Sequence, residues 1–129
     1  MLDHVILTVS DFERSIAFYR QALKPLGVTD LMDYQGPDGH ADLVGFGDSG
    51  RFYFWLKEGT PDPDAIHVGF AAKSHAAVNA FFAAAITAGG RVKIEPSPQF
   101  QYHRDYYATW VFDPDGYDIE VVNKTGQID

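Results

Sequence analysis

The sequence has no cysteine, few basic residues, and no apolar run that approaches the roughly 18 residues needed to span a membrane. The absence of cysteine excludes a disulfide scaffold, a Cys-ligated zinc site and a thiol nucleophile, and it fits a reducing compartment. Only 10 Lys and Arg stand against 18 Asp and Glu, which gives a formal net charge of −8. Because binding nucleic-acid phosphates requires an excess of cations, this balance argues against a nucleic-acid partner.

The chain has 129 residues, of which 46% are hydrophobic and 15% aromatic. A chain of this length buries enough apolar surface to hold one core, and its composition excludes disorder. Met1 leads directly into a strand-like pattern, so we expect no signal peptide. The sequence therefore predicts a single soluble domain over residues 1–129, with no membrane partner and a cytoplasmic location.

An internal repeat organises the chain, because a shift of 63 positions aligns its two halves. The matching pairs include His4-Val5 with His67-Val68, Ala17-Phe18-Tyr19 with Ala80-Phe81-Phe82, and Gly27 with Gly90. We interpret the halves as two modules, residues 1–58 and 66–123. A linker rich in proline and aspartate (59–65) joins them, and a short tail (124–129) follows.

Each module has the same predicted order of elements. In the first, residues 3–9 suit a strand, Ser10 and Glu13 have capping-box spacing, and a helix with an apolar stripe ends at Pro25 and Gly27. Strands follow at 30–34, 40–46 and 51–57. In the second, a strand at 66–72, a helix capped by Ser74, and strands at 91–95, 106–112 and 117–123 repeat the order. The fold class is therefore α+β, with two βαβββ modules.

Strand alternation assigns side chains to faces. Val5, Leu7 and Val9 share the side expected to pack under the helices, whereas His4 lies on the other side. In the second module, His67 lies opposite Val68 and Phe70 in the same way. Glu120 alternates with Ile119 and Val121. We therefore expect His4, His67 and Glu120 to point away from the helices, toward the concave side of a curled sheet.

Two histidines and one glutamate on one face form a metal-ligand set that leaves coordination positions open for water and substrate. A single histidine in a strand is usually packed or solvated. The repeat changes this balance, because the same residue type recurs at the same strand position in both halves. A glutamate between Ile119 and Val121 is costly in a core unless it is paired or bound to a cation.

Several motifs resemble the vicinal oxygen chelate superfamily, which includes glyoxalase I, fosfomycin-resistance proteins, extradiol dioxygenases and bleomycin-binding proteins. They are Leu2-Asp3-His4-Val5, Ser10 to Ser15 leading into Phe18-Tyr19, Leu26-Gly27, and Tyr106-Tyr107 through Asp113-Pro114-Asp115-Gly116 to Ile119-Glu120. The resemblance implies a curled, mostly antiparallel sheet cup with helices outside. It also implies that His4, His67 and Glu120 hold one divalent metal per chain, which is Fe, Mn, Ni, Zn or Co.

One position departs from the family pattern. Members similar to glyoxalase I carry a fourth ligand, a carboxylate in the last strand of module one. Counting four residues beyond Gly50, as Glu120 lies four beyond Gly116, gives Phe54. The nearest acid, Glu58, is expected to lie past the strand. This argues against strict glyoxalase I activity.

Further candidates surround the predicted ligands. His103 and Arg104 lie in a polar loop (98–105), where they act as an acid/base and an anion contact, or are simply solvated. In a regular hairpin, Thr109 lies opposite Glu120 and Tyr107 shares its face. Tyr107 then donates to a metal-bound oxygen, or is a core tyrosine. Phe54 forms part of a substrate wall, or of the core or a dimer interface.

These observations support three hypotheses. The first is a metalloenzyme that chelates and activates a small oxygenated substrate, with lyase or isomerase chemistry or extradiol-type dioxygenation, and Glu120, His103 and Tyr107 as its catalytic residues. Arg104, Thr109 and Phe54 then bind substrate. The second is a metal-free binding protein of the bleomycin-resistance kind. The third keeps the metal but has lost catalysis. In each case we expect a homodimer, and the modules pair either within one chain or across two.

Overall fold

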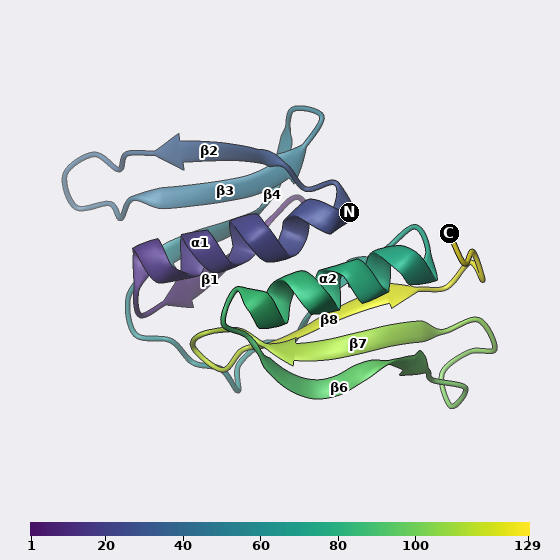
Figure 1. Ribbon diagram of the computed structural model, residues 1–129. Helices are drawn as coiled ribbons and strands as arrows, with labels where there is room; N and C mark the ends of the chain where they lie inside the picture. Colours follow the sequence, from purple (N-terminus) through teal and green to yellow (C-terminus); the bar gives the residue numbers. More distant parts are fainter.

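The computed structural model describes residues 1–129 and shows two modules side by side (Figure 1). Module one consists of β1 (Val5–Val9), α1 (Phe12–Leu23), the short 3-10 helix η1 (Lys24–Leu26), β2 (Asp30–Tyr34), β3 (Leu43–Asp48) and β4 (Arg51–Glu58). Module two consists of β5 (Val68–Ala71), α2 (His75–Thr87), β6 (Arg91–Pro98), β7 (Tyr107–Phe112) and β8 (Asp118–Asn123). The predicted α+β fold with two βαβββ modules is confirmed.

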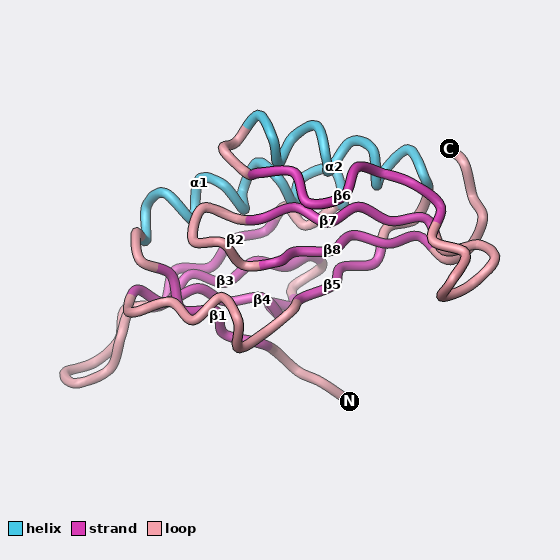
Figure 2. The backbone as a smooth tube through the Cα atoms, turned by 90° about the horizontal axis from the view of Figure 1, so that it is seen from below, coloured by secondary structure: helices cyan, strands magenta, loops and turns pink.

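Each module forms a four-stranded mixed sheet. The strand orders are β1-β4-β3-β2 and β5-β8-β7-β6. The first strand of each module pairs in parallel with the last, and the other pairs are antiparallel. Both helices cover the same side of the two sheets (Figure 2), and α1 packs against α2. The sheets do not close into a barrel within one chain.

The helices begin at polar caps. At α2, the Ser74 hydroxyl accepts a hydrogen bond from the Ala77 N–H at 3.1 Å, as the sequence predicts. At α1, the cap is Asp11 instead of Ser10, and its carboxylate accepts from the Arg14 N–H at 3.0 Å. The Ser10 hydroxyl donates to Asp115 of module two. Ser10, which the capping-box spacing predicted as the helix cap, therefore makes a contact between the two modules instead.

One continuous apolar core lies between the helices and both sheets. At its centre the Tyr19 and Phe54 rings meet edge to face with centroids 4.9 Å apart. Phe54 also contacts Phe70 of β5 at 5.3 Å, which joins the two modules. Phe54 is 0% exposed and is a core residue of the single chain, and its part in a substrate wall stays a prediction.

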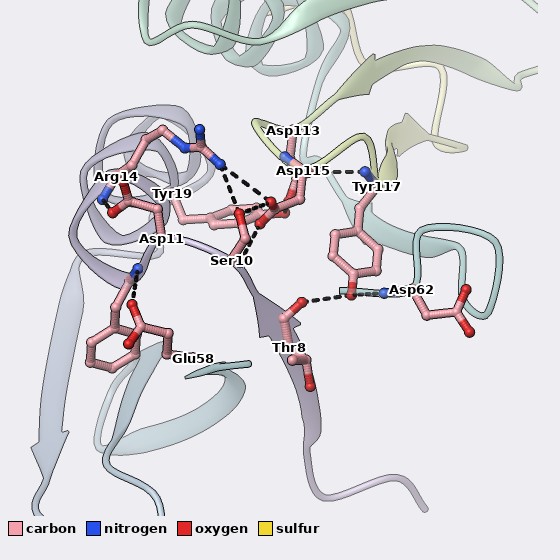
Figure 3. Close-up of polar contacts among 11 residues, drawn as sticks. Thr8, Ser10, Asp11, Arg14, Tyr19, Glu58, Asp62, Asp113, Asp115 and Tyr117 are labelled. Carbon is pink, nitrogen blue, oxygen red and sulfur yellow. Dashed lines mark hydrogen bonds and ion pairs between the residues drawn. The ribbon is translucent and has the colours of Figure 1, made fainter. Parts of the chain in front are cut away.

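A polar network fastens the turn between β7 and β8 to module one (Figure 3). The Tyr19 hydroxyl donates to Asp113 Oδ2 at 2.6 Å across the core. The Tyr117 hydroxyl donates to the Thr8 carbonyl at 2.6 Å and accepts from the Asp62 N–H at 3.0 Å. The turn that precedes β8 is therefore tied to the end of β1 and to the linker.

A β-bulge interrupts the β3–β4 pair between Phe46 and Gly47.

A Cβ atom at Gly47 would lie 1.7 Å from the Arg51 carbonyl oxygen. We expect Gly47→Ala to lower the free energy of unfolding by about 1–3 kcal/mol, because backbone has to move to admit the methyl group. Gly69→Ala, where nothing lies within 4 Å, is the matched control and should stay within about 0.5 kcal/mol in urea denaturation. Equal effects at both positions would contradict this account.

Candidate functional site

His67 and Glu120 meet on the face of module two that points away from the helices. His67 Nε2 lies 3.0 Å from Glu120 Oε1. His67 Nδ1 lies 3.1 Å from the Asp118 carbonyl oxygen, so each ring nitrogen of His67 faces an oxygen that can only accept a hydrogen bond. The parallel β5–β8 register pairs Glu120 with Gly69. The side assigned to both residues by alternation agrees with this geometry.

The Glu120 side chain borders a cavity of about 490 Å³. The residue is only 7% exposed, and its second oxygen, Oε2, accepts a hydrogen bond from the Tyr106 hydroxyl. Burial and this bond to Glu120 raise the pKa of Tyr106 to about 12. Lys124, on the same cavity wall, supplies a positive charge. The cavity thus combines an imidazole, a carboxylate, a phenol and an ammonium group.

His4 lies apart from this cavity within one chain. Its Nδ1 is 2.6 Å from Asp3 Oδ1, which leaves Nε2 free. The side chain borders two other cavities, of about 470 and 290 Å³, neither of which includes His67 or Glu120. No group of three or more His, Cys, Asp or Glu side chains in the chain is arranged to hold a metal ion. One chain therefore brings together two of the three predicted ligands.

The ladder registers identify the residue of module one that matches Glu120. Val5 pairs with Phe54 as Val68 pairs with Ile119, so Trp55 is the counterpart of Glu120. Counting from the turn glycine gives Phe54 because β4 carries one extra residue, Tyr53, at the bulge between the Phe46–Phe54 and Gly47–Phe52 pairs. The Trp55 ring lies against Gly45, where a Cβ atom would come within 2.7 Å of it. Module one thus has an indole where a fourth carboxylate ligand would stand.

The predicted positions of Thr109 and Tyr107 are wrong by one residue. Trp110, and not Thr109, pairs with Glu120. Thr109 is 0% exposed and donates to the Ile94 carbonyl at 2.7 Å. The Tyr107 hydroxyl donates to Asn79 of α2 at 2.8 Å, on the helix side of the sheet.

Tyr106 is the tyrosine that reaches Glu120, and sequence reasoning missed it. The available signal was the adjacent pair Tyr106-Tyr107, since neighbouring residues in a strand point to opposite faces. The choice between them depends on the length of the turn between Phe112 and Asp118, which the pattern does not give.

His103 and Arg104 lie in the loop before β7, outside the cavity of Glu120. The His103 Nδ1 accepts from the Asp105 N–H at 3.1 Å, within the loop. The Arg104 side chain is 88% exposed, and its Nε is 3.3 Å from Asp105. Neither contacts a candidate ligand in the chain, so their catalytic and substrate-binding roles stay predictions.

Tyr53 borders the cavity of about 470 Å³ beside His4, and its hydroxyl donates to Asp48 at 2.6 Å. Burial and this bond raise the pKa of Tyr53 from 10.0 to about 12. Between pH 10 and 12 the folded chain keeps the Tyr53 phenol proton, whereas the unfolded chain releases it. The contribution of this group to the free energy of unfolding is therefore complete below pH 10 and is lost as the pH rises toward 12. A pH titration followed by phenolate absorbance should show that Tyr53→Phe removes a tyrosine that ionises near pH 12. Loss of a group that ionises near pH 10 would contradict this.

Neither α1 nor α2 has the length and apolar character that a membrane-spanning helix needs.

The family described as Glyoxalase/Bleomycin resistance protein/Dioxygenase superfamily has a model that matches residues 1–121. The chain belongs to this superfamily, and the resemblance seen in its motifs is confirmed. Members of the superfamily bind small molecules, often use a divalent metal and often form dimers. None of the curated proteins matches the chain.

Solved structures agree with the family. A glyoxalase/bleomycin resistance protein from Albidiferax ferrireducens T118 is 30% identical, with a TM-score of 0.71, and the match covers 95% of this chain and 98% of that one. A glyoxalase I mutant from Zea mays is 25% identical with a TM-score of 0.73, and the match covers 95% of this chain but 46% of that one. The fosfomycin resistance protein FosX from Listeria monocytogenes is 18% identical with a TM-score of 0.69, over 97% and 93% of the chains, and shows the fold alone.

Proposed function

We propose that this chain is a metal-dependent member of its superfamily that binds one divalent cation per chain and activates a small oxygenated substrate. His67 and Glu120 of one copy and His4 of a second copy would be the ligands. The observation that carries the proposal is the His67–Glu120 pair, whose Nε2 and Oε1 atoms lie 3.0 Å apart on an open cavity. Elsewhere on the chain, His4 also has one ring nitrogen engaged, by Asp3, and the other nitrogen free.

The residues fit a metal by their chemistry. Metal-ligating histidines usually donate one ring N–H to a carbonyl or carboxylate, which orients the other nitrogen toward the ion. His67 uses the Asp118 carbonyl for this contact, and His4 uses the Asp3 carboxylate at 2.6 Å. Two imidazoles and one carboxylate suit Fe, Mn, Co, Ni or Zn, and leave positions for substrate oxygens.

The separation of His4 from the pair supports a symmetric dimer. In a two-fold arrangement, module one of one copy faces module two of the other, which creates two equal sites. The sheet faces that point away from the helices carry apolar side chains that a single chain leaves exposed; these are Ile6, Met32 and Tyr34 in module one, and Ile94 in module two. Covering such residues is favourable. The dimer would complete a site that one chain leaves unfinished.

The cation would supply Lewis acidity toward two neighbouring oxygens of a substrate. The chain's own groups then have distinct tasks. Glu120 provides negative charge from a side chain that is itself largely buried. Tyr106 holds the carboxylate, and Lys124 offers a positive charge to an anionic part of a substrate. This arrangement suits lyase or isomerase chemistry or extradiol-type dioxygenation, and the aromatic Trp55 in place of a fourth acid disfavours strict glyoxalase I activity.

A second candidate function is metal-free binding of an aromatic or cationic small molecule. It is favoured by the cavity of about 290 Å³ in module one, which Tyr34, Phe52 and Trp55 line, and by the net charge of −8. Aromatic faces and negative charge both attract organic cations. Metal content separates this candidate from the first.

The test uses subunit exchange between two single variants, His4→Ala and Glu120→Ala. Each variant alone should retain little cobalt after desalting, because each of its sites lacks a ligand. In a mixed dimer, the His4→Ala copy should supply His67 and Glu120 and the Glu120→Ala copy should supply His4, which makes one intact site. The other site should then carry both mutations. After exchange of equal amounts, cobalt content should rise to about a quarter of the wild-type value, given random pairing in a two-fold dimer.

The double variant His4→Ala/Glu120→Ala is the control. Mixed in equal amount with wild type, it should lower the cobalt bound from about half of the wild-type value before exchange to about a quarter after it, since every mixed dimer then has two damaged sites. No recovery in the mixture of single variants would overturn the shared site. Wild-type protein that takes up none of the five metals would overturn the metal proposal and leave the binding-protein candidate.

A further inference from the structure

The Glu120 carboxylate is held from both sides by different partners. His67 Nε2 lies 3.0 Å from Oε1, and the Tyr106 hydroxyl donates to Oε2. A phenol donates a single proton, so its bond engages one lone pair of one oxygen. A metal ion that binds His67 Nε2 would therefore meet Oε1 on the same side, while Oε2 stays engaged.

The Tyr106 ring is itself anchored. Its backbone N–H donates to the His103 carbonyl at 3.1 Å, and its carbonyl accepts from the Gln99 N–H at 2.8 Å. The Tyr102 ring lies 5.0 Å from it, and the Lys124 ammonium lies 5.4 Å from the ring centre. These contacts close the loop between β6 and β7 and fix where the hydroxyl points.

We propose that Tyr106 is a positioning residue that restricts Glu120 to coordination through one oxygen. The proposal rests on the metal site above. A carboxylate without this bond is free to rotate and bind the ion through both oxygens, which would use a coordination position that the substrate needs. Tyr106 thus sets how many positions stay open, without touching the ion.

The test compares Tyr106→Phe with Tyr107→Phe in the full-length protein, using cobalt(II) as the probe. The two variants lose the same atom from adjacent residues, but the Tyr107 hydroxyl faces Asn79 on the other side of the sheet. We expect Tyr106→Phe to weaken cobalt binding about 10-fold or more, as loss of a group that orients a ligand does. Its visible cobalt spectrum should also change, since the coordination number rises. Tyr107→Phe should match wild type in both measurements.

The outcomes separate the two proposals. Wild-type protein that binds no cobalt would overturn the metal site and this inference with it. Wild-type binding together with an unchanged affinity and spectrum in Tyr106→Phe would overturn only the positioning role. Equal losses in the two variants would also overturn it, because they would show a general effect of removing a hydroxyl. Thermal unfolding of both variants, expected to be close to wild type, confirms that the comparison concerns folded proteins.

Discussion

Replacing Asp113 with alanine is expected to lower the free energy of unfolding by about 3–5 kcal/mol, because two buried donors and one partly buried donor lose their acceptor. Asp113 is 2% exposed. Its Oδ1 accepts from the N–H groups of Asp115 and Tyr117, both at 2.9 Å, and its Oδ2 accepts from the Tyr19 hydroxyl at 2.6 Å. Urea denaturation followed by tryptophan fluorescence and circular dichroism measures the loss.

Two variants serve as controls for Asp113. Asp113→Asn keeps an acceptor for the backbone donors and should cost less than Asp113→Ala. Asp38→Ala, in an exposed turn, should stay within about 0.5 kcal/mol. A loss below about 1 kcal/mol in Asp113→Ala would contradict the structural importance of this network.

Burial also raises the pKa of Asp113 above 3.8, against the lowering effect of its hydrogen bonds. The folded state thus holds the proton more tightly than the unfolded chain does. The stability from this group is complete below pH 3.8 and falls as the pH rises through the folded pKa. Asp113→Asn should remove that part of the pH dependence.

The second large effect is expected at Glu120. Glu120→Gln keeps the size of the side chain and an acceptor for Tyr106, but it removes the negative charge. We expect its affinity for cobalt(II) to fall by more than about 100-fold, beyond the loss typical of residues that only orient a ligand. Calorimetric titration of metal-free protein measures the difference.

Glu95→Gln is the matched control, because Glu95 is an exposed carboxylate on β6 of the same module. It should bind cobalt as wild type does. If both variants bind with wild-type affinity, Glu120 is not a ligand. If both lose affinity equally, the metal is attracted only by general negative charge.

The sequence predicted the fold where short-range patterns set the structure. The alternation in β1, β5 and β8 and the Ser74 cap depend on residues a few positions apart, and both agree with the structure. The repeat, although its period is 63 residues, is a match between two such local patterns. The same alternation placed His67 and Glu120 on one face, because a strand turns its side chains with a period of two. Their types, and the absence of cysteine, determined the chemistry that the site offers.

Tertiary structure decided what depends on turn length and on contacts between modules. A one-residue difference in the β7–β8 register makes Tyr106, and not Tyr107, the neighbour of Glu120. The extra residue at the bulge of β4 makes Trp55, and not Phe54, its counterpart. The arrangement of the two modules in one chain does not bring His4 to His67 and Glu120. The sequence by itself determined which side chains point away from the core. Only the tertiary structure decided which of these side chains contact one another, because such contacts depend on strand registers and on packing between segments that are distant in the sequence.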